Sequence, residues 1–113
     1  MAYNLIVTEE MEKLLDNCVS YILRKFKNEQ AAVHLLDEVD KIYDALETNP
    51  GIYPVSDDPF LAALTYHEAI LNGMNYKIIY KYNDDNVYIL GIYHDLENYV
   101  DKIRQIWDSL NIK

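Results

Sequence analysis

The most regular pattern along the chain runs from residue 74 to residue 94, where apolar and polar side chains alternate on both sides of a polar turn. Both halves are rich in Tyr, Ile and Val, and the sequence Asn-Asp-Asp-Asn separates them, which is typical of a β-hairpin. A turn centred on Asp84 and Asp85 predicts three opposed pairs: Tyr82 with Val87, Tyr80 with Ile89, and Ile78 with Gly91.

Because directly opposed residues share a face of a sheet, this register divides the hairpin into two faces. The first face is uncharged and is predicted to form the core: Tyr76, Ile78, Tyr80, Tyr82, Val87, Ile89, Gly91 and Tyr93. The second face mixes basic and aliphatic side chains: Lys77, Ile79, Lys81, Tyr88, Leu90, Ile92 and His94. We therefore look for function on the second face.

Two segments with helical spacing precede the hairpin. Thr8 can cap the first, whose apolar stripe is Met11, Leu14, Leu15, Cys18, Val19, Ile22, Leu23 and Phe26. Asn28 can cap the second, whose stripe is Ala32, Leu35, Leu36, Val39, Ile42, Tyr43 and Leu46. The link between them is short and Pro50 follows the second, so we expect an antiparallel αα-hairpin.

The remaining segments complete an α+β domain. Residues 2–7 alternate and predict a first strand, and residues 51–59 predict a loop. Residues 60–71 fit a helix or a strand, and we expect a strand over residues 64–70 because Asn72-Gly73 is a good hairpin turn. A last amphipathic helix, with Asp95 as its cap, is predicted from Leu96, Tyr99, Val100, Ile103, Ile106, Trp107 and Leu110.

The predicted order is therefore β-α-α-β-β-β-α, with an antiparallel sheet packed on the two-helix hairpin and an additional C-terminal helix. We expect residues 1–113 to form a single domain, because the sequence shows neither a linker nor an internal repeat.

Charge and cysteine content narrow the function classes. The formal net charge is −9, which disfavours direct binding to nucleic-acid backbones. The only cysteine, Cys18, lies on a predicted apolar stripe and cannot form an internal disulfide, which fits a reducing cytoplasm. No signal-peptide pattern or long apolar run is present, so we expect a cytoplasmic protein without a membrane span.

Few residues carry recognisable chemistry. The spacing of His34, His67 and His94 matches no metal-ligand motif, and no glycine-rich phosphate loop is present, so we expect no metal or cofactor. Lys77, Lys81, Tyr88 and His94 share the second face of the hairpin and could supply acid–base groups and cations for RNA cleavage. In the alternative reading, the two lysines only solvate the edges of an aliphatic strip.

The element order and two short motifs resemble the RelE/ParE toxin superfamily of type II toxin–antitoxin (plasmid stabilisation) modules. The motifs are Tyr-Lys-Ile-Ile-Tyr at residues 76–80 and Val-Tyr-Ile-Leu-Gly-Ile-Tyr-His at residues 87–94. The resemblance covers nearly the whole chain. It implies a cognate antitoxin as partner, and either ribosome-dependent mRNA cleavage (the RelE-like branch) or inhibition of DNA gyrase by binding (the ParE-like branch).

Individual positions place the chain nearer the ParE-like branch of this resemblance. His94 matches the family, and Tyr99 lies roughly where the ribonuclease branch has a tyrosine. Lys77 and Gly91 stand where arginines are usual, and a lysine does not replace the bidentate geometry of a guanidinium. The absence of these two arginines affects RNA cleavage more than it affects binding to a protein.

Three hypotheses follow. The first, which we favour, is a ParE-like toxin that acts by protein binding. The second is a ribosome-dependent mRNA endonuclease in which Lys77, Lys81, His94 and Tyr99 form the site. The third is a non-toxic interaction module on the same fold. Whether the chain is an enzyme, and whether it forms a homodimer, stays open at this point.

The partner surface is predicted from the second face of the hairpin. An exposed strip of Ile79, Leu90 and Ile92, flanked by Lys77 and Lys81, would be an apolar patch that a partner covers. The C-terminal helix of the chain is the other candidate to cover it. Because the chain is acidic, we expect a partner segment that is apolar with Lys or Arg flanks.

Overall fold

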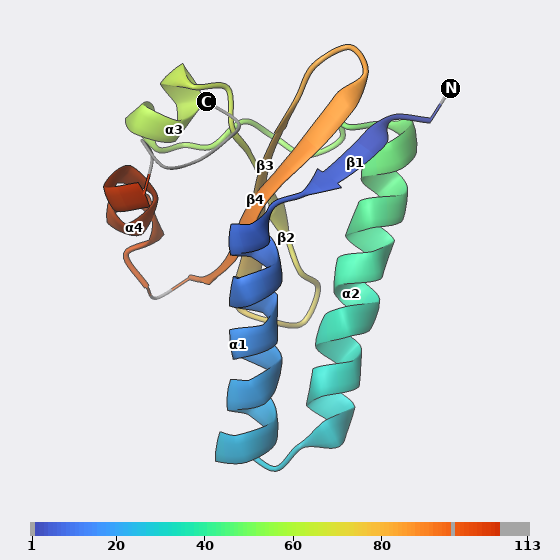
Figure 1. Ribbon diagram of the computed structural model, residues 1–113, viewed down its shortest axis with the longest axis vertical. Helices are drawn as coiled ribbons and strands as arrows, with labels where there is room; N and C mark the ends of the chain where they lie inside the picture. Colours follow the sequence, from blue (N-terminus) through green and yellow to red (C-terminus); the bar gives the residue numbers. More distant parts are fainter. Residues whose placement is uncertain (1, 96, 107–113) are drawn as a thin grey trace.

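The computed structural model describes residues 2–95 and 97–106, and it arranges one sheet between two layers of helices (Figure 1). The elements are β1 (Asn4–Val7), α1 (Glu9–Lys25), α2 (Glu29–Thr48), α3 (Pro59–Ala63), β2 (His67–Ile70), β3 (Tyr76–Tyr82), β4 (Asn86–His94) and α4 (Tyr99–Ile106). The predicted order is confirmed, with the short helix α3 as an addition. No helix among the described residues is long and apolar enough to cross a membrane.

The helix starts follow the predicted capping residues. Thr8 Oγ1 accepts a hydrogen bond from the Met11 N–H at 3.1 Å, and Asn28 Oδ1 accepts one from the Ala31 N–H at 3.0 Å. Asp58 caps α3 in the same way, and Pro59 occupies its first turn. The last helix begins at Tyr99 instead of directly after Asp95.

The segment of residues 64–70 is only partly a strand, and β2 begins at His67. The residues before it belong to α3 and to a turn in which Thr65 has a φ of 63°, in the left-handed region. This turn reverses the chain out of α3, so extended pairing with β3 can start only after it. Both interpretations of residues 60–71, helix and strand, were therefore correct for part of the segment.

The sheet has the strand order β1-β4-β3-β2 and is mixed. β2, β3 and β4 pair antiparallel as predicted, but β1 pairs parallel with β4, which corrects the expectation of a wholly antiparallel sheet. A parallel pair needs a long crossover connection, and here both long helices and two strands lie between the partners.

The register of the hairpin is confirmed near its turn and shifts beyond it. Tyr82 pairs with Val87 and Tyr80 with Ile89, but the next pairs are Ile79 with Gly91 and Ile78 with Ile92. β4 therefore contains a β-bulge, with one more residue than β3 at this point. Beyond the bulge, Ile92 and His94 change from the predicted second face to the first, and Tyr93 changes in the opposite direction.

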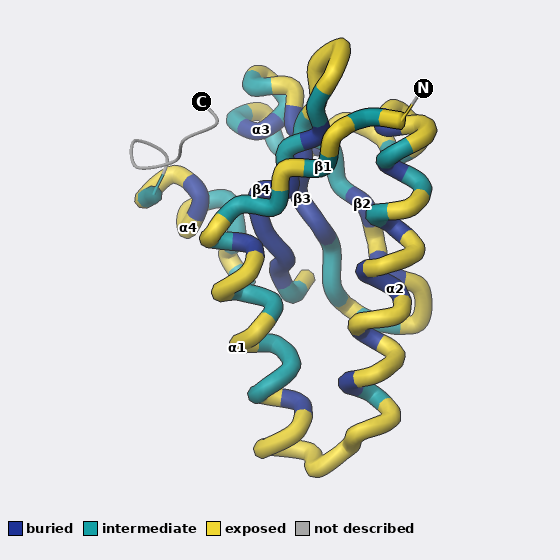
Figure 2. Tube along the Cα trace, turned by 45° about the vertical axis from the view of Figure 1, so that its right-hand side comes forward, coloured by how far each residue is buried: buried dark blue, intermediate teal, exposed yellow. Residues whose placement is uncertain are grey.

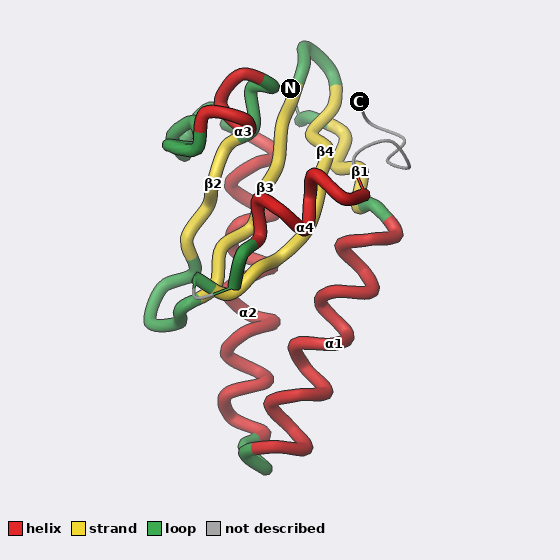
Figure 3. The backbone as a smooth tube through the Cα atoms, turned by 90° about the vertical axis from the view of Figure 1, so that its left-hand side faces the viewer, coloured by secondary structure: helices red, strands yellow, loops and turns green. Residues whose placement is uncertain are grey.

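Each face of the sheet has its own apolar core. In Figure 2, the buried stretches of the chain are dark blue. Between the sheet and the helices α1 and α2, the predicted core residues Ile78, Tyr80, Val87 and Ile89 are fully buried, and Tyr76 is partly buried. On the other face, α3 and α4 cover a smaller cluster: Leu61, Tyr66, Ile79, Leu90, Tyr93 and Ile103. The turn between α1 and α2 extends beyond the sheet (Figure 3).

Candidate functional site

Lys77 lies in a network of ion pairs and hydrogen bonds beneath the start of α4. Its Nζ is 3.1 Å from Glu68 Oε1 and 3.4 Å from Asp95 Oδ1. Glu68 Oε2 also accepts hydrogen bonds from Ser56 Oγ at 2.5 Å and from the Tyr99 hydroxyl at 3.1 Å. Glu68 thus joins β2, β3, α4 and the loop before α3.

The charges of this network reinforce one another. Burial alone lowers the pKa of Lys77, but the hydrogen bond to Glu68 and the charge of that carboxylate, together with Tyr99, outweigh burial, so the pKa is raised. Burial and the same carboxylate raise the pKa of Tyr99, whose ring centroid is 4.9 Å from Lys77 Nζ. Lys77 is therefore a cation already engaged by two carboxylates and an aromatic ring.

The other two proposed catalytic residues lie apart from this network. Lys81 is four residues further along β3, with Nζ 5.3 Å from the ring centroid of Tyr66, and burial lowers its pKa. His94 lies on the opposite face of the sheet, where its ring meets that of Tyr76 edge-on at 5.1 Å. The structure brings Lys77 and Tyr99 together but separates His94 from them, because the bulge in β4 turns His94 to the other face.

The predicted partner strip is also divided. Ile79 and Leu90 have 0% exposure beneath α3 and α4, so the expectation that they are exposed is wrong. The chain's own C-terminal helix covers them through Val100 and Ile103; Leu96, Trp107 and Leu110 lie outside the described residues. Ile92 is on the other face, where it lines a cavity.

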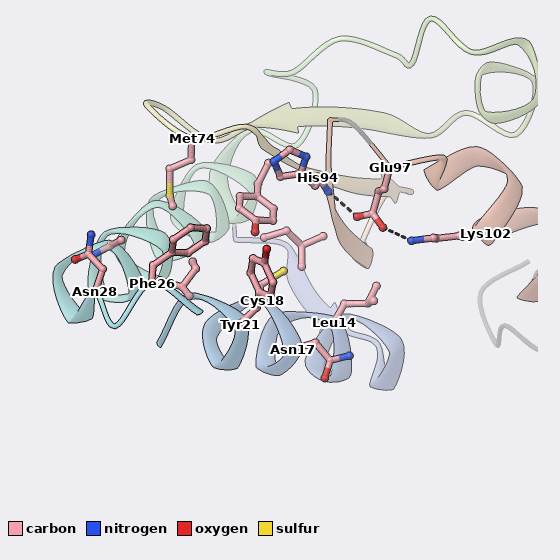
Figure 4. Close-up of a pocket in the computed structure, with 14 residues that line it drawn as sticks. Leu14, Asn17, Cys18, Tyr21, Phe26, Asn28, Met74, His94, Glu97 and Lys102 are labelled. Atoms are coloured by element: carbon pink, nitrogen blue, oxygen red, sulfur yellow. Dashed lines mark hydrogen bonds and ion pairs between the residues drawn. The ribbon is translucent and has the colours of Figure 1, made fainter. Parts of the chain in front are cut away.

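This cavity, which we call the α1 groove, has a volume of about 910 Å³ and lies between α1, the start of α2 and the ends of β3 and β4 (Figure 4). Its lining is mainly apolar and aromatic: Leu14, Cys18, Tyr21, Ile22, Phe26, Ala31, Met74, Tyr76 and Ile92, with Asn17, Asn28, His94, Glu97 and Lys102 as the polar members. The pattern did not separate it from the core, because Leu14, Cys18 and Phe26 belong to one long stripe on α1.

The polar groups of the α1 groove are largely satisfied or protonated. The backbone N–H of His94 donates to Glu97 Oε1 at 2.6 Å, and Glu97 forms an ion pair with Lys102. Burial, and secondarily the charge of Glu97, raise the pKa of Cys18 to about 11, although a hydrogen bond with Tyr76 acts in the opposite direction. Cys18 is therefore a neutral thiol at pH 7, which makes it a poor nucleophile.

Residues 2–95 and 97–106 contain no cluster of three or more His, Cys, Asp or Glu side chains that could hold a metal ion. Because most of its lining residues are apolar or aromatic, the α1 groove is suited to receiving apolar side chains of a second molecule.

Comparisons with solved structures return the same fold. The chromosomal ParDE toxin–antitoxin system from P. aeruginosa matches with a TM-score of 0.66 and 15% identity, over 82% of this chain and 96% of that one. The toxin–antitoxin complex RelBE2 from Mycobacterium tuberculosis matches with a TM-score of 0.55 and 21% identity, over 83% of this chain and 99% of that one.

Sequence comparisons give the family. No curated protein matches the chain in a sequence search. Residues 5–110, however, match the family described as the ParE toxin of the type II toxin–antitoxin system parDE. Because the match spans nearly the whole chain, the protein belongs to the ParE toxin family.

Proposed function

We propose that this protein is a toxin that acts by binding a protein target, with DNA gyrase as the target and a cognate antitoxin as the protein that neutralises it. The observation that carries this proposal is the state of Lys77. Its ammonium group forms ion pairs with Glu68 and Asp95 and lies over the ring of Tyr99. These two carboxylates already compensate the positive charge that an RNA phosphate would need.

Cleavage of RNA by attack of the 2′-hydroxyl requires a base, an acid and cations around one phosphate. His94 lies on the opposite face of the sheet from Lys77 and Tyr99, so these groups do not converge on a common phosphate. The net charge of −9 adds a general repulsion of nucleic acid. These observations favour the protein-binding hypothesis over the ribosome-dependent endonuclease.

The partner proposal rests on the family and on the fold. The two solved structures described above come from a ParDE toxin–antitoxin system and from the toxin–antitoxin complex RelBE2. An antitoxin that occupies an apolar surface of the toxin would keep the toxin inactive until it is removed. Gyrase and ribosomes are both cytoplasmic, so the proposed action is placed in that compartment, which a lone reduced cysteine also suits.

The test is inducible expression in a bacterial host that carries separate reporters for DNA damage and for protein synthesis. Growth arrest with early induction of the DNA-damage reporter is expected, and the purified protein should inhibit supercoiling by gyrase in vitro. Early arrest of protein synthesis with a silent DNA-damage reporter would support the endonuclease instead. Unimpaired growth at verified expression would leave the non-toxic interaction module as the remaining hypothesis.

A further inference from the structure

We infer that the tip of the helical hairpin is the surface through which this protein contacts its target, and that the tip fits an acidic protein surface with an apolar centre. The tip is defined here as residues 23–27, which form the last turn of α1 and the start of the link to α2. This inference rests on the proposed function, because it assigns the surface and the chemistry of the contact with gyrase.

The tip stands away from the rest of the fold. α1 and α2 run past the end of the sheet, and the turn that joins them forms one end of the molecule along its longest axis (Figure 1). Residues 23–30 are all exposed, so the tube in Figure 2 is yellow around this turn. A projecting element of this kind can enter a recess on another protein ahead of the sheet.

Two apolar side chains of the tip face solvent. Phe26 is 62% exposed and Leu23 is 39% exposed, and the ring of Tyr21 meets that of Phe26 edge-on at 5.6 Å. Cations at the end of α1 complement the helix dipole, but the dipole gives no reason for an exposed aromatic ring beside them. Aromatic residues and arginine are enriched at the centres of protein interfaces, where they act as anchors. The tip therefore carries the residue types that anchor a protein contact.

The tip also reverses the sign of the molecule's charge. Residues 17–36 contain three cations, Arg24, Lys25 and Lys27, and one carboxylate, Glu29, so this stretch has a charge of +2 while the whole chain carries −9. Among residues 2–95 and 97–106, no ion pair involves any of the three cations, although three other lysines are paired. These cations are therefore available to carboxylates of a partner.

The other carboxylates of the two helices lie beyond the range of this local field. On α1 the nearest one is Asp16, eight residues before Arg24, which corresponds to about 12 Å along the helix. On α2 it is Asp37, which lies eight residues, again about 12 Å, from Glu29. Because the Debye length at physiological salt is about 8 Å, a surface in contact with the tip experiences mainly the cations of the tip.

The backbone at Lys27 supports a role for this position in binding. Lys27 has a φ of 49°, in the left-handed region, which glycine or asparagine adopts at lower cost. A long charged side chain occupies the position instead. Residues held in such conformations cluster at binding and switch regions, where the surrounding structure fixes them.

A protein surface fits the tip better than a nucleic-acid backbone does. An aliphatic side chain such as Leu23 gains nothing from contact with phosphates, and three cations on a molecule of charge −9 leave a net repulsion from DNA. A protein surface that places carboxylates around an apolar recess satisfies both the cations and Phe26.

The first test measures binding to purified gyrase and inhibition of supercoiling. Phe26→Gln should weaken both about tenfold or more, as expected for the loss of an aromatic anchor. Lys27→Gly should weaken both by roughly two- to fivefold, and less at high salt, while its urea midpoint stays at least as high as that of the wild type because glycine relieves the left-handed φ. The controls are Ile52→Gln, an apolar residue that is 54% exposed beyond the far end of α2, and Lys13→Gln, an exposed lysine on α1; both should bind like the wild type.

The outcomes separate this inference from the proposed function. A wild-type protein that neither binds nor inhibits gyrase would contradict the proposed function and, with it, the inference. Normal binding by Phe26→Gln and Lys27→Gly, with an inhibitory wild type, would overturn the tip as the contact surface and leave the proposed function intact.

The second test identifies the chemistry of the contacted surface. A photo-crosslinking amino acid in place of Phe26 is activated in the complex with gyrase, with and without DNA, and the crosslinked peptides are sequenced by mass spectrometry. Crosslinks to gyrase peptides rich in Asp and Glu are expected in both cases, and the same group in place of Ile52 should give none. Crosslinks to DNA, or to peptides rich in Lys and Arg, would overturn the acidic protein surface as the partner.

Discussion

At Gly91 the backbone of β4 comes so close to its neighbours that a side chain does not fit. A Cβ built there would lie 2.7 Å from the Tyr93 hydroxyl oxygen and 2.9 Å from Leu14 Cδ1. Gly91 is also the residue next to the bulge, so it permits both the close approach to α1 and the shift that turns His94 toward the α1 groove.

Gly91→Ala is expected to lower the free energy of unfolding by about 1–3 kcal/mol, because Leu14 and Tyr93 belong to packed clusters and must move. The measurement is the urea midpoint. Gly51→Ala is the matched control, since its Cβ would meet the end of the partly exposed Tyr82 side chain at 3.0 Å, which can move away. Equal losses in the two variants would contradict this account of Gly91.

Cys18 gives the protein a pH dependence in the alkaline range. Its pKa is raised from 9.0 to about 11 in the folded state, so the unfolded chain releases the thiol proton first as the pH rises. The contribution to stability is complete below pH 9 and is lost as the pH rises toward 11. The free energy of unfolding should therefore fall more steeply between pH 8.5 and pH 10 in the wild type than in Cys18→Ala. Identical slopes would show that Cys18 ionises equally easily in both states.

Polar contacts and one apolar anchor hold α4 against the rest of the fold. Tyr99 donates to Glu68, Lys77 Nζ lies over the Tyr99 ring, and Arg104 lies 4.4 Å from the ring centroid of Phe60 on α3. Ile103 supplies a fully buried apolar anchor between these contacts. The position of α4 over Ile79 and Leu90 is therefore set jointly by one carboxylate, two cations and a small apolar cluster.

Glu68→Gln should loosen α4 without unfolding the sheet, because it removes the charge that Lys77 and Tyr99 share. We expect faster hydrogen exchange in residues 99–106 and a loss of about 1–3 kcal/mol in stability. Glu12→Gln, which removes an exposed carboxylate on α1, is the control and should leave exchange in α4 unchanged. Unchanged exchange in Glu68→Gln would show that the apolar contacts of Ile103 suffice to hold the helix.

Sequence patterns predicted the elements better than they predicted the contacts between elements. Features that depend on nearby residues are confirmed: the helix caps at Thr8 and Asn28, and the strand pairs next to the hairpin turn. The bulge could not be inferred, because the alternation of residues 74–94 continues through it, and the close packing of β4 at Gly91 involves Leu14, which lies far away in the sequence. The faces predicted for Ile92 and His94 were wrong because the bulge shifts the register of β4 before both residues.

For the whole molecule, the separation of Lys77 from His94 predicts that the purified protein does not cleave free RNA. Incubation with end-labelled RNA at low salt should leave the substrate intact, because the two residues lie on opposite faces of the sheet and Lys77 is already paired with Glu68. Specific cleavage that is abolished by Lys77→Ala or His94→Ala would contradict the proposed function and favour the endonuclease. Cleavage that survives both substitutions would indicate a contaminating nuclease.

The parallel pairing of β1 with β4 sets the order in which this protein can mature on the ribosome. Asn4 and Asn86 are partners that lie 82 residues apart, so β1 emerges first and waits for the strand that completes it. At roughly 5–20 residues per second, this delay lasts about 4–16 seconds. Until β4 has been synthesised, the helical hairpin of a nascent chain has no complete sheet to pack against. A translation product that ends before β4 therefore cannot adopt the toxin fold.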